Sequence, residues 1–359
     1  MTIKIETVIL GGGVAGLAAA RRLIELGIKP LVIEAGSYPV HKVCGEFFSP
    51  SSLQILKRWD INLIPLRQVR LHTLTQSLAF NFPSPAGALS HITLDTELAL
   101  QIIQLGATLL TNTKVEKLIP SFDGIGIHRL ILSSGEEIFA KHLLIAAGRL
   151  SSHSNNAPAI RYAGFKTHFS GIDLNSTLKM FSFPDAYLGL VPIENGGTNM
   201  ACITTIENFK KASSSKQFMQ TLIGSHPSLY KLISAGSNLF ADWLEAFIPE
   251  FGLRLTPDWP RTYWIGDAAG TIPPASGNGL SLALASGCLA AEYASRDDPV
   301  GFKRAWRKRC ASQIFYGKGL HQLMFHPTLG NCAIRAGRLF PSLGAKIFSI
   351  SREAPKNLD

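Results

Sequence analysis

Apolar residues in the first 34 positions alternate between a strand pattern and a helix pattern. The apolar run at 5–10 predicts a strand, and the segment 15–26, rich in Ala and Leu, predicts a helix that ends at Gly27. Residues 30–34 predict a second short strand. Strand, helix and strand in this order predict a βαβ unit with a parallel sheet.

The remaining pattern predicts a chain in which β-rich and helical sections follow one another. The expected elements are a helix at 94–106, a strand at 111–118, a hairpin of 127–132 and 137–146, a β-rich section at 165–206, a mostly helical section at 207–250, a strand at 263–265 and a helix at 281–294. After Pro299 we expect helices with breaks at Pro327, Gly330 and Pro341.

Composition adds limits to this picture. The chain has 359 residues, 46% of them hydrophobic and 17% charged, which favours two domains and excludes a disordered chain. Its five cysteines are scattered without a CxxC pair, so we expect neither a disulfide scaffold nor a metal site. No run of 18 apolar residues occurs, and the glycines at 11–13 interrupt the apolar stretch near the N-terminus. We therefore expect a cytoplasmic protein, without a signal peptide or a spanning helix.

The net charge of +10 predicts anionic partners of some kind. The densest basic run lies at 303–309, and Phe302, Trp306 and Cys310 share one face of a helix at this spacing. Such a basic amphipathic helix is either a solvated surface helix or one that docks on a membrane surface or a carrier protein. No signature of nucleic-acid binding occurs, and we expect no such partner.

The glycines at 11, 13 and 16 follow the first strand with the spacing Gly-x-Gly-x-x-Gly. Gly11 permits a tight turn, Gly13 lets the backbone approach a pyrophosphate, and Gly16 lets the helix pack on the sheet. The N–H groups at the helix start then bind phosphates. Glu34 ends the next strand, and its separation in sequence from Gly16 is about that of the carboxylate that binds a ribose hydroxyl in dinucleotide-binding folds. The segment therefore predicts dinucleotide binding.

A second glycine-rich segment, 266–280, lies between the predicted strand at 263–265 and the helix at 281–294. Asp267 follows the strand, where a carboxylate can accept hydrogen bonds from a polyol. The glycine-lined helix start can hold an anionic ring edge. An ordinary strand-turn-helix is the alternative.

These two segments resemble the FAD-binding signatures of the flavoprotein superfamily that contains aromatic-ring hydroxylases and geranylgeranyl reductases. The resemblance implies an α/β fold, with a Rossmann-like FAD-binding domain of the glutathione-reductase type, similar to para-hydroxybenzoate hydroxylase, an inserted β-sheet substrate domain and a helical C-terminal tail. The implied domains are 1–72, 92–164 and 255–298 for FAD, 73–91 and 165–254 for substrate, and 299–359 for the tail.

The same resemblance implies a set of cofactor contacts. The first glycine cluster and Glu34 would hold the ADP part of FAD, Asp267 the ribityl chain and pyrophosphate, and 277–280 the flavin pyrimidine edge. The implied cofactor-binding residues are Gly11, Gly13, Val14, Ala15, Gly16, Glu34, Ala35, Lys42, Cys44, Val115, Gly148, Gly266, Asp267, Pro274, Gly277, Asn278, Gly279 and Leu280.

The stretch 42–46 is similar to a Lys-x-Cys-Gly stretch close to the flavin in the reductase branch. Cys44 is either a reactive thiol, with a pKa lowered by Lys42 and His41, or a small packing residue. The resemblance also implies that 165–206 forms a sheet over the flavin. The candidate catalytic residues are Cys44, His168 and Tyr187, with Lys166 as a further polar side chain, and a structural role is the alternative for each.

Several positions depart from the superfamily's patterns. Gly270 stands where hydroxylases usually carry His, which favours the reductase branch, and Ala147 stands where an Asp-Gly signature has its Asp. His91 replaces an Arg found in many members, and it either contacts the cofactor side or lies in a solvated loop. The segment 187–192 keeps the Tyr and Pro of the reductases' Tyr-x-Trp-x-Phe-Pro motif but lacks its Trp and Phe. A halogenase Trp-x-Trp-x-Ile motif is missing too.

These observations leave three functions open. The one we place first is a monooxygenase that hydroxylates an apolar or aromatic, polyketide-like substrate with reduced flavin and O₂. The second is a reductase of carbon–carbon double bonds in an isoprenoid lipid, and the third is a non-catalytic flavin or lipid carrier. We expect FAD as the cofactor and NAD(P)H as a transient electron donor. The expected substrate is small and hydrophobic or aromatic, and an anionic or carrier-bound molecule is one alternative.

The C-terminal tail carries apolar side chains among Lys and Arg. These are Leu320, Leu323, Met324, Phe325, Leu339, Phe340, Ile347 and Phe348. They either cap the core or let the basic helices make peripheral contact with a membrane.

Overall fold

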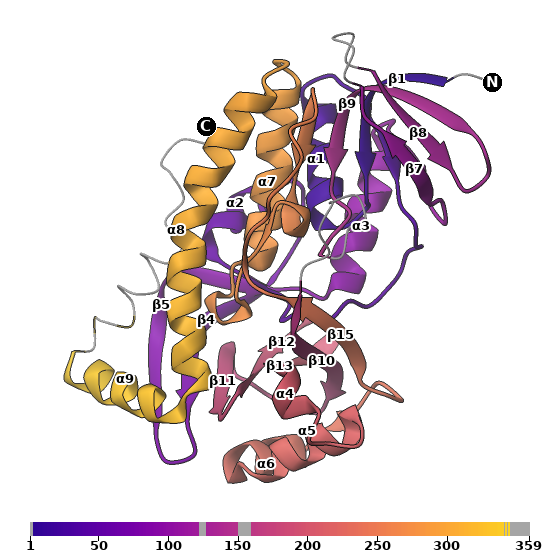
Figure 1. Cartoon of the computed structure of the whole chain (residues 1–359). Helices are drawn as coiled ribbons and strands as arrows, with labels where there is room; N and C mark the ends of the chain where they lie inside the picture. The colour runs from indigo at the N-terminus through magenta and orange to yellow at the C-terminus, as the bar shows by residue number, and fades with distance from the viewer. Residues whose placement is uncertain (1–2, 122–126, 150–158, 341, 343, 345–359) are drawn as a thin grey trace.

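The computed structural model describes residues 3–121, 127–149, 159–340, 342 and 344. Two β-sheets form its frame, one above the other in the view of Figure 1, and a long helix runs along one edge of both. Each sheet has its own apolar core, so the chain is built as two halves.

The first sheet has seven strands and is parallel around its centre. Strand β1 pairs with β2 and β9 in parallel, β2 pairs with β6, and β17 pairs with β9, whereas β7, β8 and β9 form an antiparallel meander. The strands are β1 (Ile3–Leu10), β2 (Leu31–Ile33), β6 (Thr108–Leu110), β7 (Val115–Ile119), β8 (His128–Leu132), β9 (Glu137–Ile145) and β17 (Thr262–Trp264). The predicted βαβ unit and hairpin are confirmed.

Two helices from opposite ends of the chain pack closely beside this sheet. They are α1 (Val14–Glu25) and α7 (Gly279–Ala294), and their contact is lined by glycine and alanine. A Cβ atom placed on Gly287 of α7 would lie 2.2 Å from the carbonyl oxygen of Ala15. Because only a glycine fits there, the backbones of α1 and α7 approach each other directly. Helix α3 (His91–Gln104) packs against α1 as well.

The second sheet has nine strands and is largely antiparallel. Its order is β14-β10-β13-β12-β11-β4-β5-β3, with β15 paired to β10. The strands are β3 (Phe47–Phe48), β4 (Ile64–His72), β5 (Ser77–Ala88), β10 (Ile160–Ser170), β11 (Thr177–Phe183), β12 (Ala186–Pro192), β13 (Thr198–Thr205), β14 (Ser237–Asn238) and β15 (Leu244–Pro249). This confirms a β-rich section around 165–206.

Short helices cover one face of the second sheet and connect the elements around the cleft. Over that face lie α4 (Ile206–Phe209), α5 (Ser215–Gly224) and α6 (Pro227–Ile233), whose apolar residues join those of β10 to β13 in one core. The connecting elements are α2 (Leu53–Arg58), the short strands β16 (Gly252–Leu253) and β18 (Gly270–Thr271), and four 3₁₀ turns at Pro50–Ser52, Glu194–Gly196, Gly266–Ala268 and Pro274–Ser276.

Two helices end the described part of the chain. Helix α8 (Pro299–Phe325) runs along the edge in Figure 1, and α9 (Pro327–Leu339) folds back from it against β5. Phe302, Trp306 and Cys310 lie on the buried face of α8, as their spacing predicts. Among the described residues, no helix combines the length and apolar character that crossing a membrane requires.

Three expectations about local structure are wrong. Residues 244–249 were expected in a helical section but form β15, because pairing with the edge of β10 overrides local propensity. Gly330 does not break a helix but lies inside α9, where it packs against Thr73. The strand expected at 111–118 begins only at Val115, as β7, while residues 108–110 before it form the separate strand β6 in another part of the first sheet. Pro341, Ile347 and Phe348 lie outside the described residues.

The expected domain limits at 72 and 164 fall within the second sheet, between β4 and β5 and inside β10. The expected division of the chain into domains stays a prediction.

The contact between α1 and α7 predicts how two helical glycines respond to substitution. Gly287→Ala should destabilise the protein by about 1–3 kcal/mol, because the new methyl group overlaps the Ala15 carbonyl. Gly319→Ala in α8, where a Cβ meets no atom within 4 Å, should instead stabilise it by about 0.5–1 kcal/mol. Denaturant unfolding of both variants measures this. A Gly287→Ala protein as stable as the wild type would contradict the close approach.

Candidate functional site

The turn after β1 places the first glycine cluster at the start of α1. Gly11 has a φ of +108°, and a Cβ there would lie 2.4 Å from the Ala146 carbonyl oxygen, so only glycine fits. A Cβ on Gly16 would meet the Gly11 carbonyl at 1.9 Å, which holds α1 tightly on this turn. No side chain caps α1 within the described part of the chain, so its first N–H groups are available to a ligand.

Glu34 lies beside this turn at the end of β2. Its Oε2 accepts a hydrogen bond from the Gly12 N–H at 2.5 Å, and its Oε1 accepts one from the Gly36 N–H at 2.8 Å. Tyr38 donates its hydroxyl hydrogen to the Gly12 carbonyl. A carboxylate has about four acceptor positions, so Glu34 retains capacity for the hydroxyl groups of a ribose.

The second glycine-rich segment meets the first one at the other end of the same cleft. Gly266 has a φ of +57°, and a Cβ there would lie 2.9 Å from Cβ of Ala15 at the start of α1. The next side chain, Asp267, is 46% exposed and has Arg149 Nε at 3.5 Å. Arg254 donates to the Asp267 carbonyl oxygen at 3.0 Å. Two segments about 250 residues apart thus form one site.

A single cavity of about 730 Å³ joins these groups. The predicted residues that line it are Gly11, Gly13, Val14, Ala15, Glu34, Ala35, Lys42, Cys44, Val115, Gly148, Tyr187, Gly266, Asp267, Pro274, Gly277, Gly279 and Leu280. Three predicted residues lie elsewhere. Gly16 is buried beneath Gly11, Asn278 accepts a hydrogen bond from Ser49 and donates to Gln313, and His168 contacts Glu46.

At several of the lining glycines, backbone atoms face this cavity with no side chain between. A Cβ on Gly45, Gly148 or Gly189 would meet no atom within 4 Å, and one on Gly13 would meet only Lys42 Nζ, at 3.8 Å. The backbone here surrounds open space that ordinary side chains would fill. Combined with the uncapped starts of α1 and α7, this cradle fits a flat, phosphate-bearing cofactor such as FAD.

Cys44 belongs to a chain of charged groups on the wall of the cavity. Its thiol interacts electrostatically with the His91 ring, His91 Nδ1 lies 3.2 Å from Asp95 Oδ1, and Lys42 Nζ lies 2.7 Å from Asp95 Oδ2. Burial favours a neutral thiol, but the charge and hydrogen bond of His91 outweigh it and lower the pKa of Cys44. The arrangement therefore favours ionisation of the Cys44 thiol beside His91.

His91 and Asp95 complete this chain. Burial lowers the pKa of His91, yet Asp95 and Cys44 outweigh it and raise that pKa to about 10. The expectation that Lys42 and His41 act on Cys44 is wrong. Lys42 binds Asp95, and His41 packs against the rings of His168 and Phe240. The helix expected from residue 94 begins at His91, one turn before Asp95, and the contact of His91 with Cys44 had no signal in the sequence.

A second buried ionic cluster surrounds Glu46, which sequence reasoning missed. Its carboxylate accepts hydrogen bonds from Lys166 Nζ and from the backbone N–H of His91 at 2.7 Å, and it contacts His168 Nε2 at 2.9 Å. Burial raises the pKa of Glu46, but His168 and Lys166 lower it below its usual value. Lys166 and His168 are therefore structural here, while Tyr187 lines the cavity and burial raises the pKa of its phenol.

The far half of the cavity, which we call the chamber, lies between the second sheet and the last two helices. Its walls are apolar: Val69, Leu71, Leu78, Phe80, Phe82, Leu178, Met180, Val191, Leu320, Leu323, Ala333 and Gly337. These come from β4, β5, β11, β12, α8 and α9. The charged residues that line the same cavity come from other parts of the chain: Glu34, Lys42, Glu46, Lys114, Arg149 and Asp267. The chamber therefore fits an apolar molecule.

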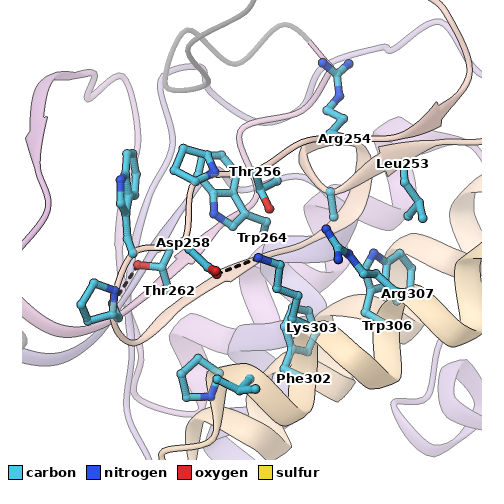
Figure 2. Close-up of a pocket in the computed structure, with 16 residues that line it drawn as sticks. Leu253, Arg254, Thr256, Asp258, Thr262, Trp264, Phe302, Lys303, Trp306 and Arg307 are labelled. Atoms are coloured by element: carbon cyan, nitrogen blue, oxygen red, sulfur yellow. Dashed lines mark hydrogen bonds and ion pairs between the residues drawn. The ribbon is translucent and has the colours of Figure 1, made fainter.

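A smaller cavity of about 240 Å³ lies near the start of α8, and Figure 2 shows its lining. Trp264 and Trp306 form its walls, and Lys303 Nζ lies 2.7 Å from Asp258 Oδ1 across it. Arg254, which also binds the Asp267 carbonyl, lies between this cavity and the cofactor cleft. Its volume is below the usual range for cofactor sites, about 300–1,000 Å³, so it does not compete for FAD.

Known proteins resemble this chain over most of its length. A menaquinone reductase of Mycolicibacterium smegmatis is 23% identical over 333 residues, which cover 85% of this chain and 80% of that protein. Digeranylgeranylglycerophospholipid reductase 2 of Methanothermobacter thermautotrophicus is 23% identical over 340 residues, 87% of this chain and 86% of that protein. The structure of the flavin-dependent brominase Bmp2 matches with a TM-score of 0.81 at 16% identity, over 97% and 93% of the two chains. No protein-family model matches the sequence.

The fold and the cleft define an enzyme built on a dinucleotide-binding half and a second, substrate-facing half. The chain is similar over most of its length to FAD-dependent oxidoreductases, among them reductases and a halogenase, as its resemblance predicts. The predicted fold class is confirmed. Because the superfamily consists of oxidoreductases, the interpretation as a non-catalytic carrier loses its support.

The contact between Cys44 and His91 predicts the pH dependence of thiol alkylation. In a Cys332→Ser background, which removes the exposed cysteine, iodoacetamide should modify Cys44 faster at pH 7 than it modifies a thiol of ordinary pKa. His91→Gln removes the positive charge, and a thiol of ordinary pKa, about 8.5, is only a few per cent ionised at pH 7. The rate at pH 7 should therefore fall severalfold in this variant and rise more steeply with pH. Equal profiles would contradict the ion pair.

Proposed function

We propose that the chain is an FAD-dependent reductase that saturates carbon–carbon double bonds in an apolar, isoprenoid-like molecule. The observation that carries this proposal is the chamber, whose walls are apolar and which is continuous with the cofactor cleft. A hydroxylase substrate with an anionic or phenolic group needs a polar partner in its pocket, because burying such a group unpaired is strongly unfavourable. An isoprenoid chain needs none.

In this proposal the two glycine-rich segments hold FAD. The N–H groups at the start of α1 and the carboxylate of Glu34 bind the ADP part, and Asp267 with residues 277–280 binds the flavin part. When bound, FAD supplies hydride equivalents. NAD(P)H remains the predicted electron donor, without a second dinucleotide fold among the described residues.

Saturating a double bond also requires a proton, and the cavity wall provides a group for it. Cys44 lines the cavity, and the His91 ring behind it carries a proton that Asp95 stabilises. Passing a proton from His91 through Cys44 to a substrate carbon leaves His91 neutral and Cys44 as the thiolate. His91 then regains a proton from solvent. General-acid catalysis of this kind is worth about 10²–10⁴-fold.

The relatives support this choice of reaction. Both carry the name of a reductase, one of them acting on a digeranylgeranyl glycerophospholipid. Gly270, which stands where hydroxylases usually carry His, favours the same branch. We therefore reverse the order expected from the sequence, in which oxygen transfer came first. The chamber has apolar walls although the Trp and Phe of the reductase motif are missing.

A side chain added in the glycine cradle should block FAD and leave the fold intact. Gly13 has a φ of −78°, which any residue tolerates, and its Cβ would enter the cleft. Gly13→Val should weaken FAD binding by about 1–3 kcal/mol, about 5- to 150-fold, because the methyl groups overlap the ligand. Gly224→Val, at an open position in α5, is the matched control. Flavin fluorescence titration measures both, and equal affinities would show that FAD does not bind there.

The proposed reaction predicts turnover without oxygen. Anaerobic enzyme with dithionite-reduced flavin should saturate a geranylgeranyl lipid, detected as a mass gain of two hydrogens per double bond. Cys44→Ser should slow this step about a hundredfold, since the ionisable proton donor is lost, while flavin content stays unchanged. Cys332→Ser, at an exposed cysteine, is the control. Incorporation of labelled oxygen, with no anaerobic turnover, would instead identify a monooxygenase.

A further inference from the structure

The face of α8 that points away from the core combines basic and aromatic side chains. Arg304, Lys308, Phe315 and Lys318 lie on this face by helical spacing and are exposed, opposite the buried Trp306. Phe315 is 74% exposed. A phenylalanine so exposed loses most of the stabilisation that burial gives, about 1.5–3 kcal/mol. The position of Phe315 between basic side chains therefore indicates a surface that a binding partner covers.

Helix α9 continues this pattern at its end. Leu339 and Phe340 are 76% and 63% exposed, and Arg335 and Arg338 are exposed beside them. Figure 1 shows α9 leading away from the lower end of α8, at the same edge of the molecule. We call the exposed residues Arg304, Lys308, Phe315, Lys318, Arg335, Arg338, Leu339 and Phe340 the docking face.

The charge of this segment has one sign throughout. Between Pro299 and Phe340 the sequence contains no Asp or Glu. It contains eight basic residues: Lys303, Arg304, Arg307, Lys308, Arg309, Lys318, Arg335 and Arg338. Within the described part of the chain, only Lys303 among them has an ion pair, with Asp258 (Figure 2). Most of the protein's net charge of +10 therefore lies on these two helices.

The inner side of α9 is a wall of the chamber. Ala333 and Gly337 line the cavity, and a Cβ on Gly337 would lie only 2.5 Å from Leu78 of β5. Helix α9 thus separates the chamber from the exterior with small residues inside and basic and apolar residues outside. A bilayer surface beside α9 would therefore lie only one helix away from the chamber.

We propose that the docking face binds the surface of a bilayer rich in anionic phospholipid, with Phe315, Leu339 and Phe340 in the headgroup layer and the basic side chains against lipid phosphates. Each Lys or Arg near such a surface contributes about 1 kcal/mol, and apolar insertion adds to it. The choice of a lipid surface over an acidic protein rests on the exposed apolar side chains and the chamber behind them. The identity of the chamber's ligand rests on the proposed function.

Vesicle flotation tests the docking face without needing turnover. The full chain should float with phosphatidylglycerol vesicles at low salt, bind them less as salt increases, and bind phosphatidylcholine vesicles weakly. The double variant Lys308→Gln, Lys318→Gln should weaken binding about 25-fold, because each lost charge weakens it about fivefold. Phe315→Ser with Phe340→Ser should also weaken it. Tyr230→Ser with Lys231→Gln on α6, where Tyr230 is 58% exposed, is the matched control and should bind normally.

Two results would overturn the proposal: no flotation with anionic vesicles at low salt, or equal loss of binding in the α6 control. Measuring lipid reduction both in vesicles and in detergent distinguishes a failure of the docking proposal from a failure of the proposed function. If the docking variants lose activity only on vesicles, docking is supported. If the wild type floats but reduces neither lipid, docking stands and the proposed reaction fails.

Discussion

The close approach of α1 and α7 is the contact on which the cofactor cleft depends. Gly287 lets the two helices pack backbone to backbone, and Gly266 lies against Ala15 at the start of α1. These contacts bring the starts of two helices, from opposite ends of the sequence, to one cavity. Each helix start carries a partial positive charge, and the two together define where an anionic cofactor binds. A larger side chain at any of these positions would separate them.

Those parts of the fold that follow from local rules could be predicted from the sequence. The turn at Gly11, the helix after it and Glu34 form a short-range unit, and all lie where the glycine spacing predicts. Contacts between distant segments could not be predicted. Residues 244–249 are a strand only because β10 offers an edge, and Asn278 turns away from the cleft because Ser49 and Gln313 bind it.

The same distinction holds for the chemistry of the site. A short motif predicted that Cys44 contacts the cofactor, and the residue lines the cavity, but the motif gave no sign of its partner, because His91 lies on a helix far along the chain. The chamber has no sequence motif at all. Its residues come from four strands and two helices, and each of them alone has the pattern of an ordinary core position. The shape of the chamber is thus encoded in tertiary packing.

The Glu46 cluster has a consequence for how the two halves move. Glu46 is held by the start of α3 in the first half and by Lys166 and His168 of β10 in the second. Pulling the halves apart would leave charged groups unpaired in a dry interior, which costs several kcal/mol. The Glu46 cluster therefore ties the two halves together beside the cavity, and separating them would break every one of its charged contacts.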